Sequence, residues 1–156
     1  MKRTLIEDYA RGGPLLATSI QGLTKPDFQA YPVPGTWSIQ QIVLHLMDSD
    51  LVASDRMKRV IAEENPTIIG YNETLFSQKL FYERMDPFLA AEIFAKNRQL
   101  TAEILRNLPD VAFDRVGTHN EAGRITLGHL VETYVKHLEH HLQFLRQKRQ
   151  LLGKPL

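Results

Sequence analysis

A chain of 156 residues, 43% of them hydrophobic and 24% charged, is predicted to fold as a single domain over residues 1–156. The net charge of +1 argues against nucleic acid as a partner, and the absence of cysteine excludes disulfides, iron–sulfur clusters and cysteine-based zinc sites. No apolar stretch is long enough to cross a bilayer, and no signal-peptide hydrophobic run follows Met1, so we expect a cytoplasmic protein without a membrane partner.

The first third of the chain predicts two long helices joined by a loop. Apolar residues at helical spacing mark a first helix over residues 5–23, which Gly12, Gly13 and Pro14 should kink or break because proline removes a backbone donor. The prolines of residues 25–35 predict an ordered loop. Ser38 then begins a capping box with Gln41, and a second helix follows whose apolar face extends to residue 61.

The remainder predicts a short helix and two more long ones. A shorter helical pattern covers residues 75–81, and Asp86 caps a third long helix that ends before Pro109. Residues 113–125 are expected to be irregular or briefly extended, and Thr126 caps a fourth long helix that extends to about Lys148. The sequence therefore predicts an all-α four-helix bundle with a short extra helix between the second and third long helices.

Three of the six histidines fall within one five-residue stretch of the fourth long helix, residues 137–141, and helical periodicity ranks the histidines of this helix. At 100° per residue, His141 and His137 lie about 60° and about 90° from the centre of the apolar face, whereas His140 and His129 lie about 150° or more away. His137 and His141 are one turn apart on one face, which is the spacing that offers two imidazoles to one ion. His129 and His140, and His119 in a glycine-rich loop, are predicted to be solvated.

His45 is the candidate for a third ligand. It lies about 120° from the apolar centre of the second helix, which places it at a seam between helices. Metal sites in bundles are assembled from residues on facing helices, so His45, His137 and His141 could share an ion. The alternative interpretation, which the spacing alone leaves open, is that His45 is a hydrogen-bonded packing residue.

Asp50 is the informative acidic residue, because it lies within about 20° of the apolar centre of its helix and needs a partner if buried. It could hold the second nitrogen of a metal-bound imidazole, or it could pair with Arg56 or Arg98. Gln143 and Tyr134 are further candidates for hydrogen bonds to the metal ligands, and Asp48 is predicted to be solvated. No catalytic base is assigned.

Two segments of the sequence resemble a known family. They are WSIQQIVLHLMD (residues 37–48) and HLEHHLQ (residues 137–143), supported by similarity over residues 9–34 and 123–128. The sequence is similar to the DinB/YfiT-like superfamily of metal-binding four-helix bundles. The resemblance implies that His45, His137 and His141 bind a divalent metal and that the protein forms a homodimer.

The resemblance and the site chemistry together leave two classes of function. Three neutral imidazoles leave the full charge of a divalent ion and an open coordination position, which is typical of a catalytic site; zinc or nickel is expected first, and iron or copper also suits imidazole. The first hypothesis is a metal-dependent enzyme acting on a small molecule, either a thiol S-transferase that uses a low-molecular-weight thiol or a hydrolase. The alternative is a non-catalytic metal-binding or protein-interaction bundle.

Overall fold

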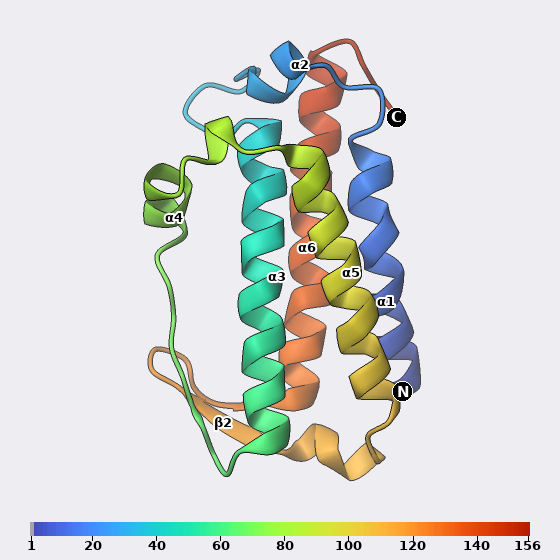
Figure 1. Cartoon of the computed structure of the whole chain (residues 1–156), viewed down its shortest axis with the longest axis vertical. Coiled ribbons are helices and arrows are strands. Elements are labelled where there is room, and N and C mark those ends of the chain that lie inside the picture. Colours follow the sequence, from blue (N-terminus) through green and yellow to red (C-terminus); the bar gives the residue numbers. More distant parts are fainter. Residues whose placement is uncertain (1) are drawn as a thin grey trace.

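Four long helices form the body of the protein in the computed structural model, which describes residues 2–156 (Figure 1). They are α1 (Lys2–Ser19), α3 (Ile39–Ala62), α5 (Pro87–Arg106) and α6 (Leu127–Leu151). Both α5 and α6 pack against α1 and against α3, so the four helices close into one bundle. The predicted four-helix bundle is confirmed. Among the described residues, no helix is both long and apolar enough to cross a membrane.

The connections carry short elements, and the predicted extra helix is one of them. They are α2 (Lys25–Gln29), α4 (Glu73–Lys79), the 3₁₀ turns η1 (Tyr82–Arg84) and η2 (Asp110–Asp114), and strands β1 (Thr67–Ile68), β2 (Val116–His119) and β3 (Gly123–Thr126). The segment expected to be irregular or briefly extended forms the antiparallel β2–β3 hairpin, and β1 pairs in parallel with β2. This small sheet lies at one end of the bundle (Figure 1).

Helix α1 differs from the prediction, because it continues past Pro14 without the expected break. Its glycines have a different role, which is to let α1 approach α5 closely. A Cβ at Gly12 would lie 2.4 Å from Nη1 of Arg98, and a Cβ at Gly13 would lie 3.4 Å from the carbonyl oxygen of Ala95. The glycine pair therefore marks a helix contact rather than a helix end.

Side-chain caps fix where the long helices begin. The backbone N–H of Gln41 donates to Ser38 Oγ at 3.2 Å, and Gln41 Oε1 accepts from the backbone N–H of Ser38 at 2.9 Å, which confirms the predicted capping box. Asp86 and Thr126 cap α5 and α6 in the predicted way. The loop expected over residues 25–35 is partly helical, because Pro26 lies in the first turn of α2, where a missing N–H costs no hydrogen bond.

The core consists of two apolar clusters, one towards each end of the bundle. On α3, residues 39–47 belong to one cluster and residues 53–60 to the other, so that Asp50 lies between them. Arg98 lies between the two clusters on α5 in the same way. A polar layer therefore crosses the middle of the bundle, and the candidate site is built close to it.

Candidate metal centre

The structure brings the three candidate histidines together at the contact between α3 and α6. Nε2 of His45 lies 3.1 Å from Nε2 of His137. Each of His45, His137 and His141 offers a ring nitrogen within 4.8 Å of the others. His140 and His129 are exposed on α6, as their helix positions predict. The cluster of His45, His137 and His141 is called the triad below.

His45 is more deeply buried than its predicted place at a helix seam suggests. Its side chain is 0% exposed, and the Trp37 ring packs against it at 4.9 Å between centroids. Nδ1 of His45 has no hydrogen-bond partner among the described residues. Among the described residues, the hydrogen-bonding contact of the His45 ring is with His137, which is itself a candidate metal ligand.

The electrostatic state of the triad suits a divalent cation. Burial lowers the pKa of His45 and of His137 to about 3, and it lowers that of His141 to about 4, so all three rings are neutral near pH 7. Nitrogens bound tetrahedrally to zinc at about 2.0–2.1 Å are about 3.4 Å apart, close to the separation of the two Nε2 atoms. The donors present thus fit a divalent metal.

Glu73 is a residue at the triad that the sequence analysis missed. Its Oε2 atom lies 3.9 Å from Nε2 of His45, and its side chain is 55% exposed. Glu73 is the first residue of α4, which Asn72 caps by accepting the backbone N–H of Leu75 at 2.9 Å. The available signal was an acidic residue in the first turn of the predicted short helix, but only the path of the chain after α3 brings it to His45.

A polar cavity of about 260 Å³ opens beside His137 and Glu73. Its Arg56 side chain is held by hydrogen bonds to the Tyr134 hydroxyl at 2.9 Å and to the Ile69 carbonyl at 2.7 Å. Among the described residues, Nε of Arg56 is buried and makes no hydrogen bond, and the buried Tyr71 hydroxyl has at most a weak contact with Ser49. Burial raises the pKa of Tyr71 to about 12, so this hydroxyl keeps its proton. The cavity therefore combines the carboxylates of Glu73 and Glu121 with the donors of Arg56 and Tyr71, and it adjoins the triad at His137.

His119 lines the same cavity and is half-buried, which corrects the prediction that it is solvated. Its Nδ1 accepts the backbone N–H groups of Glu121 at 3.1 Å and of Ala122 at 3.2 Å. These bonds tighten the turn between β2 and β3. The ring therefore shapes the wall of the cavity by holding the hairpin.

Of the three residues proposed as hydrogen-bond partners of the metal ligands, Asp50 and Gln143 lie elsewhere, and the Tyr134 hydroxyl beside His137 accepts from Arg56. Asp50 forms a buried salt bridge with Arg98 at 2.8 Å and makes no hydrogen bond to the triad among the described residues. The predicted pairing with Arg98 is therefore the correct alternative. Gln143 is exposed on α6, so it does not face the triad. Asp48 is half-buried rather than solvated, because it accepts a hydrogen bond from the Tyr82 hydroxyl.

A bundle in which two neighbouring helices present three neutral imidazoles to one point belongs to the class of metal-binding four-helix bundle proteins. The family model of the DinB superfamily matches residues 10–145, and the chain belongs to that superfamily.

Sequence relatives and a solved structure agree with this assignment. The chain is 31% identical over 137 residues to "Putative metal-dependent hydrolase OB0782" of Oceanobacillus iheyensis, covering 88% of this chain and 77% of that protein. It is 29% identical over 120 residues to "Putative metal-dependent hydrolase YfiT" of Bacillus subtilis, and the match covers 76% of this chain and 67% of that protein. A solved structure described as "YfiT from Bacillus subtilis is a probable metal-dependent hydrolase with an unusual four-helix bundle topology" superposes with a TM-score of 0.91 at 25% identity, covering 97% of this chain and 87% of that one.

Burial of neutral imidazoles makes the stability of the metal-free protein dependent on pH. The triad histidines take up protons near pH 6.5 when the chain is unfolded, but only near pH 3 to 4 when it is folded. Below pH 6.5 the unfolded chain therefore binds more protons, and stability falls as the pH falls. We expect the free energy of unfolding to decrease by roughly 1 kcal/mol per pH unit for each triad histidine, less than the full 1.4 because two of them are partly exposed.

Urea unfolding of the EDTA-treated protein between pH 7 and pH 5 measures this slope. Burial raises the pKa of Asp50, which acts in the opposite direction, so the comparison is made with His137→Asn rather than on the slope of the wild type alone. The variant should have a slope shallower by roughly 1 kcal/mol per pH unit. Equal slopes for the wild type and the variant would contradict the burial argument.

Proposed function

We propose that this protein is a divalent-metal-dependent hydrolase of a small molecule, with zinc or nickel as its metal. One observation carries the proposal. The ring nitrogens of His45, His137 and His141 converge beside the carboxylate of Glu73, next to the polar cavity that Glu73 and His137 line. The names of the relatives, which describe metal-dependent hydrolases, support the same reaction class. The three histidines would hold the metal through their ring nitrogens. Iron and copper also suit these donors.

When bound, a divalent cation would supply Lewis acidity towards a substrate oxygen and would make a water molecule more acidic. The neutrality of the three imidazoles preserves the full charge of such a cation. Three protein donors also leave room for a substrate or a water molecule, as in catalytic rather than structural sites.

The residues of the polar cavity have separate roles in this proposal. Among residues 2–156, Glu73 makes no shorter polar contact than the one with His45, so its carboxylate is available to accept a proton from water. Arg56 and Tyr71 line the cavity with N–H and O–H donors, and they would stabilise negative charge on a substrate oxygen. The bonds of Arg56 to Tyr134 and Ile69 hold its guanidinium in place before substrate binds.

Hydrolysis is preferred over the other predicted functions because of Glu73. A hydrolase needs a proton acceptor near its water, and this carboxylate provides one, whereas transfer of a low-molecular-weight thiol does not require it. Thiol transfer at the triad and a non-catalytic metal-binding bundle stay as predictions. A homodimer also stays a prediction, and the exposed side chains of Leu89, Ile93 and Leu100 on α5 offer an apolar face for it.

The Glu73→Gln variant tests the proposed role of the carboxylate. We expect kcat to fall by about 10²- to 10⁴-fold, because a general base is removed, while zinc affinity changes only a few-fold. The assay uses tag-free, zinc-loaded protein and a panel of p-nitrophenyl esters, with metal content measured on the same samples. Glu121→Gln is the matched control, since Glu121 lines the same cavity without a contact to the triad.

Two results would count against the proposal. The first is a zinc-loaded wild type that hydrolyses no ester faster than the EDTA-treated protein does, which would favour the non-catalytic bundle. The second is an unchanged kcat in Glu73→Gln, which would remove the base. A large loss of zinc affinity in that variant would instead assign Glu73 as a fourth ligand.

A further inference from the structure

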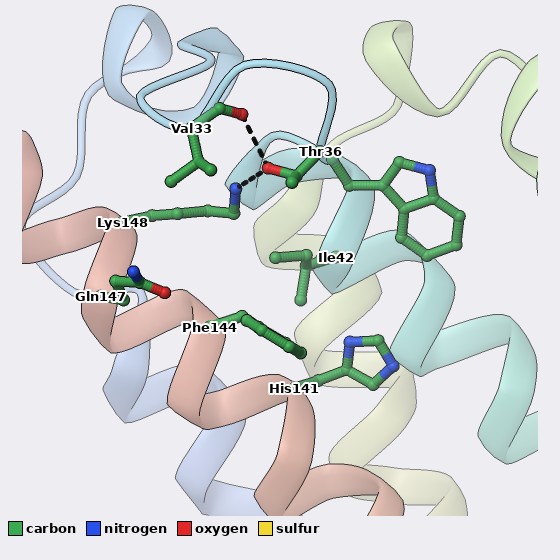
Figure 2. A pocket seen from close by; sticks show the side chains of 8 residues that line it. Val33, Thr36, Ile42, His141, Phe144, Gln147 and Lys148 are labelled. Carbon is green, nitrogen blue, oxygen red and sulfur yellow. Dashed lines mark hydrogen bonds between the residues drawn. The ribbon is translucent and has the colours of Figure 1, made fainter.

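A second cavity, of about 280 Å³, is lined by His141, whereas the polar cavity is lined by His137. It lies between α6 and the loop that leads into α3 (Figure 2). The side chains that line it are Val33, Thr36, Trp37, Ile42, His141, Phe144, Gln147 and Lys148. Its walls are almost entirely apolar, and it meets the triad through His141 and through Trp37, which packs on His45.

Lys148 is the unusual residue of this cavity. It is 3% exposed, yet it forms no salt bridge with any described residue. Its Nζ donates to Thr36 Oγ1 at 2.6 Å, and the Thr36 hydroxyl donates in turn to the Val33 carbonyl at 2.8 Å (Figure 2). This chain of bonds fixes the ammonium at the loop, and among the described residues two of its three N–H donors have no protein partner. Burying a charge without a counter-charge costs free energy, and an anionic ligand at Lys148 would offset that cost.

Charge in the cavity is limited to this one ammonium. Among the described side chains that line it, Lys148 is the only Lys, Arg, Asp or Glu, and the other titratable residue is the candidate metal ligand His141. Arg149, the neighbouring cation, is turned away and donates to the carbonyls of Ser19 and Gln21. One cation among apolar walls is complementary to a molecule with a single negative charge and an apolar body.

The length of that molecule follows from the helix. Lys148 is seven residues beyond His141, which is about two turns or about 10 Å of helix rise. Phe144 lies between them, and the three side chains project from α6 towards the same space (Figure 2). A ligand that spans the cavity from Lys148 to His141 is therefore about two helix turns long.

We propose that this cavity is a substrate subsite for a small apolar carboxylic acid. The carboxylate pairs with Lys148, the apolar body packs against Trp37, Ile42 and Phe144, and the far end of the molecule reaches His141. The assignment of this ligand as substrate rests on the proposed function, whereas its binding does not. A cavity of about 280 Å³ limits the ligand to a small molecule.

Octanoate and octanamide test the proposal, because they share an eight-carbon body about two helix turns long and differ in charge. Trp37 is the single tryptophan of the chain and lines the cavity, so its fluorescence reports binding directly. With EDTA-treated wild-type protein, we expect octanoate to bind at least tenfold more tightly than octanamide. In Lys148→Met the difference should shrink to less than about twofold, while octanamide binds as before.

Two further variants complete the experiment. Lys148→Gln keeps a polar tip that can reach Thr36 but lacks the charge, and it must lose the preference as well. Lys136→Met removes an exposed lysine of the same helix that pairs with Glu132, and it must keep the wild-type preference. Equal affinity of the wild type for the two probes, or a tenfold preference that persists in both Lys148 variants, would overturn the proposal.

The binding site and the proposed function can fail separately. If zinc-loaded protein hydrolyses neutral esters but binds octanoate no better than octanamide, the subsite is wrong and the hydrolase stands. If octanoate is preferred but no ester is turned over, the subsite stands as a ligand site and the hydrolase is wrong.

Discussion

Replacement of His137 or His141 by alanine is expected to abolish tight binding of zinc or nickel, whereas replacement of His140 is expected to leave it unchanged. The first two residues belong to the triad, and the third lies exposed between them in sequence. Removing a ligand should lower the affinity by more than about 100-fold, because loss of a mere hydrogen-bond partner of a ligand already costs 10- to 100-fold. His45→Ala should behave like the other two triad variants.

Thermal unfolding of tag-free protein with and without added metal provides the measurement. Metal at 100 times its Kd stabilises a protein by about 2.7 kcal/mol, which corresponds to a rise in Tm of roughly 5–10 °C for a domain of this size. The wild type and His140→Ala should show this rise, and the triad variants should not. Metal binding that is lost in His140→Ala but kept in His137→Ala would show that the wrong face of α6 was chosen.

The triad could be selected from the sequence because its members are defined by local helix geometry. His137 and His141 differ from His140 only in the face of α6 that they occupy, and a rotation of 100° per residue is enough to separate them. The selection of His45 as the third ligand required the family resemblance in addition. Its complete burial depends on Trp37, which folds back over it from the residue before the Ser38 cap, and helical periodicity does not describe such a contact.

Glu73 could not be found in the same way, because its position depends on a long connection. It is separated from His45 by the rest of α3, by β1 and by the loop that leads to α4. The register of β1 against β2 guides this path, and that pairing joins residues about fifty positions apart. Sequence patterns describe one element at a time, so they do not report where such a connection ends.

The Gly12–Gly13 pair shows the same limit in the fold. Glycine and proline together are a strong signal for the end of a helix, and the local prediction followed that signal. The outcome was decided by a partner on another helix, because Arg98 occupies the space that a Cβ at Gly12 would fill. Packing between helices therefore overrode local propensity at this position.

Arg98 and Asp50 form the centre of a polar network that joins all four long helices. Both side chains are 1% exposed, and Nε of Arg98 donates to Asp50 Oδ1 at 2.8 Å. Nη2 of Arg98 donates to the Tyr134 carbonyl on α6 at 2.8 Å, and Nη1 donates to the Tyr9 carbonyl on α1 at 3.3 Å. Asn97 gives Asp50 a further hydrogen bond at 2.8 Å. Tyr134 lies one turn before His137, so the network also holds α6 where the triad needs it.

Asp50→Asn is therefore expected to be the most destabilising single change made to a polar residue of this protein. It leaves the Arg98 guanidinium buried without a counter-charge, which costs about 3–5 kcal/mol and should lower Tm by roughly 10 °C. Glu7→Gln is the matched control, because Glu7 pairs through both carboxylate oxygens with Arg106 at the surface, and it should change Tm little.

The double variant Asp50→Asn, Arg98→Met separates the loss of the pair from the cost of a stranded charge. It removes both charges, so it should be more stable than Asp50→Asn alone, measured as the midpoint of urea unfolding. A double variant less stable than Asp50→Asn would show that Arg98 acts mainly through its hydrogen bonds to the Tyr9 and Tyr134 carbonyls. In that case the arginine, rather than the ion pair, would fix the arrangement of the four helices around the triad.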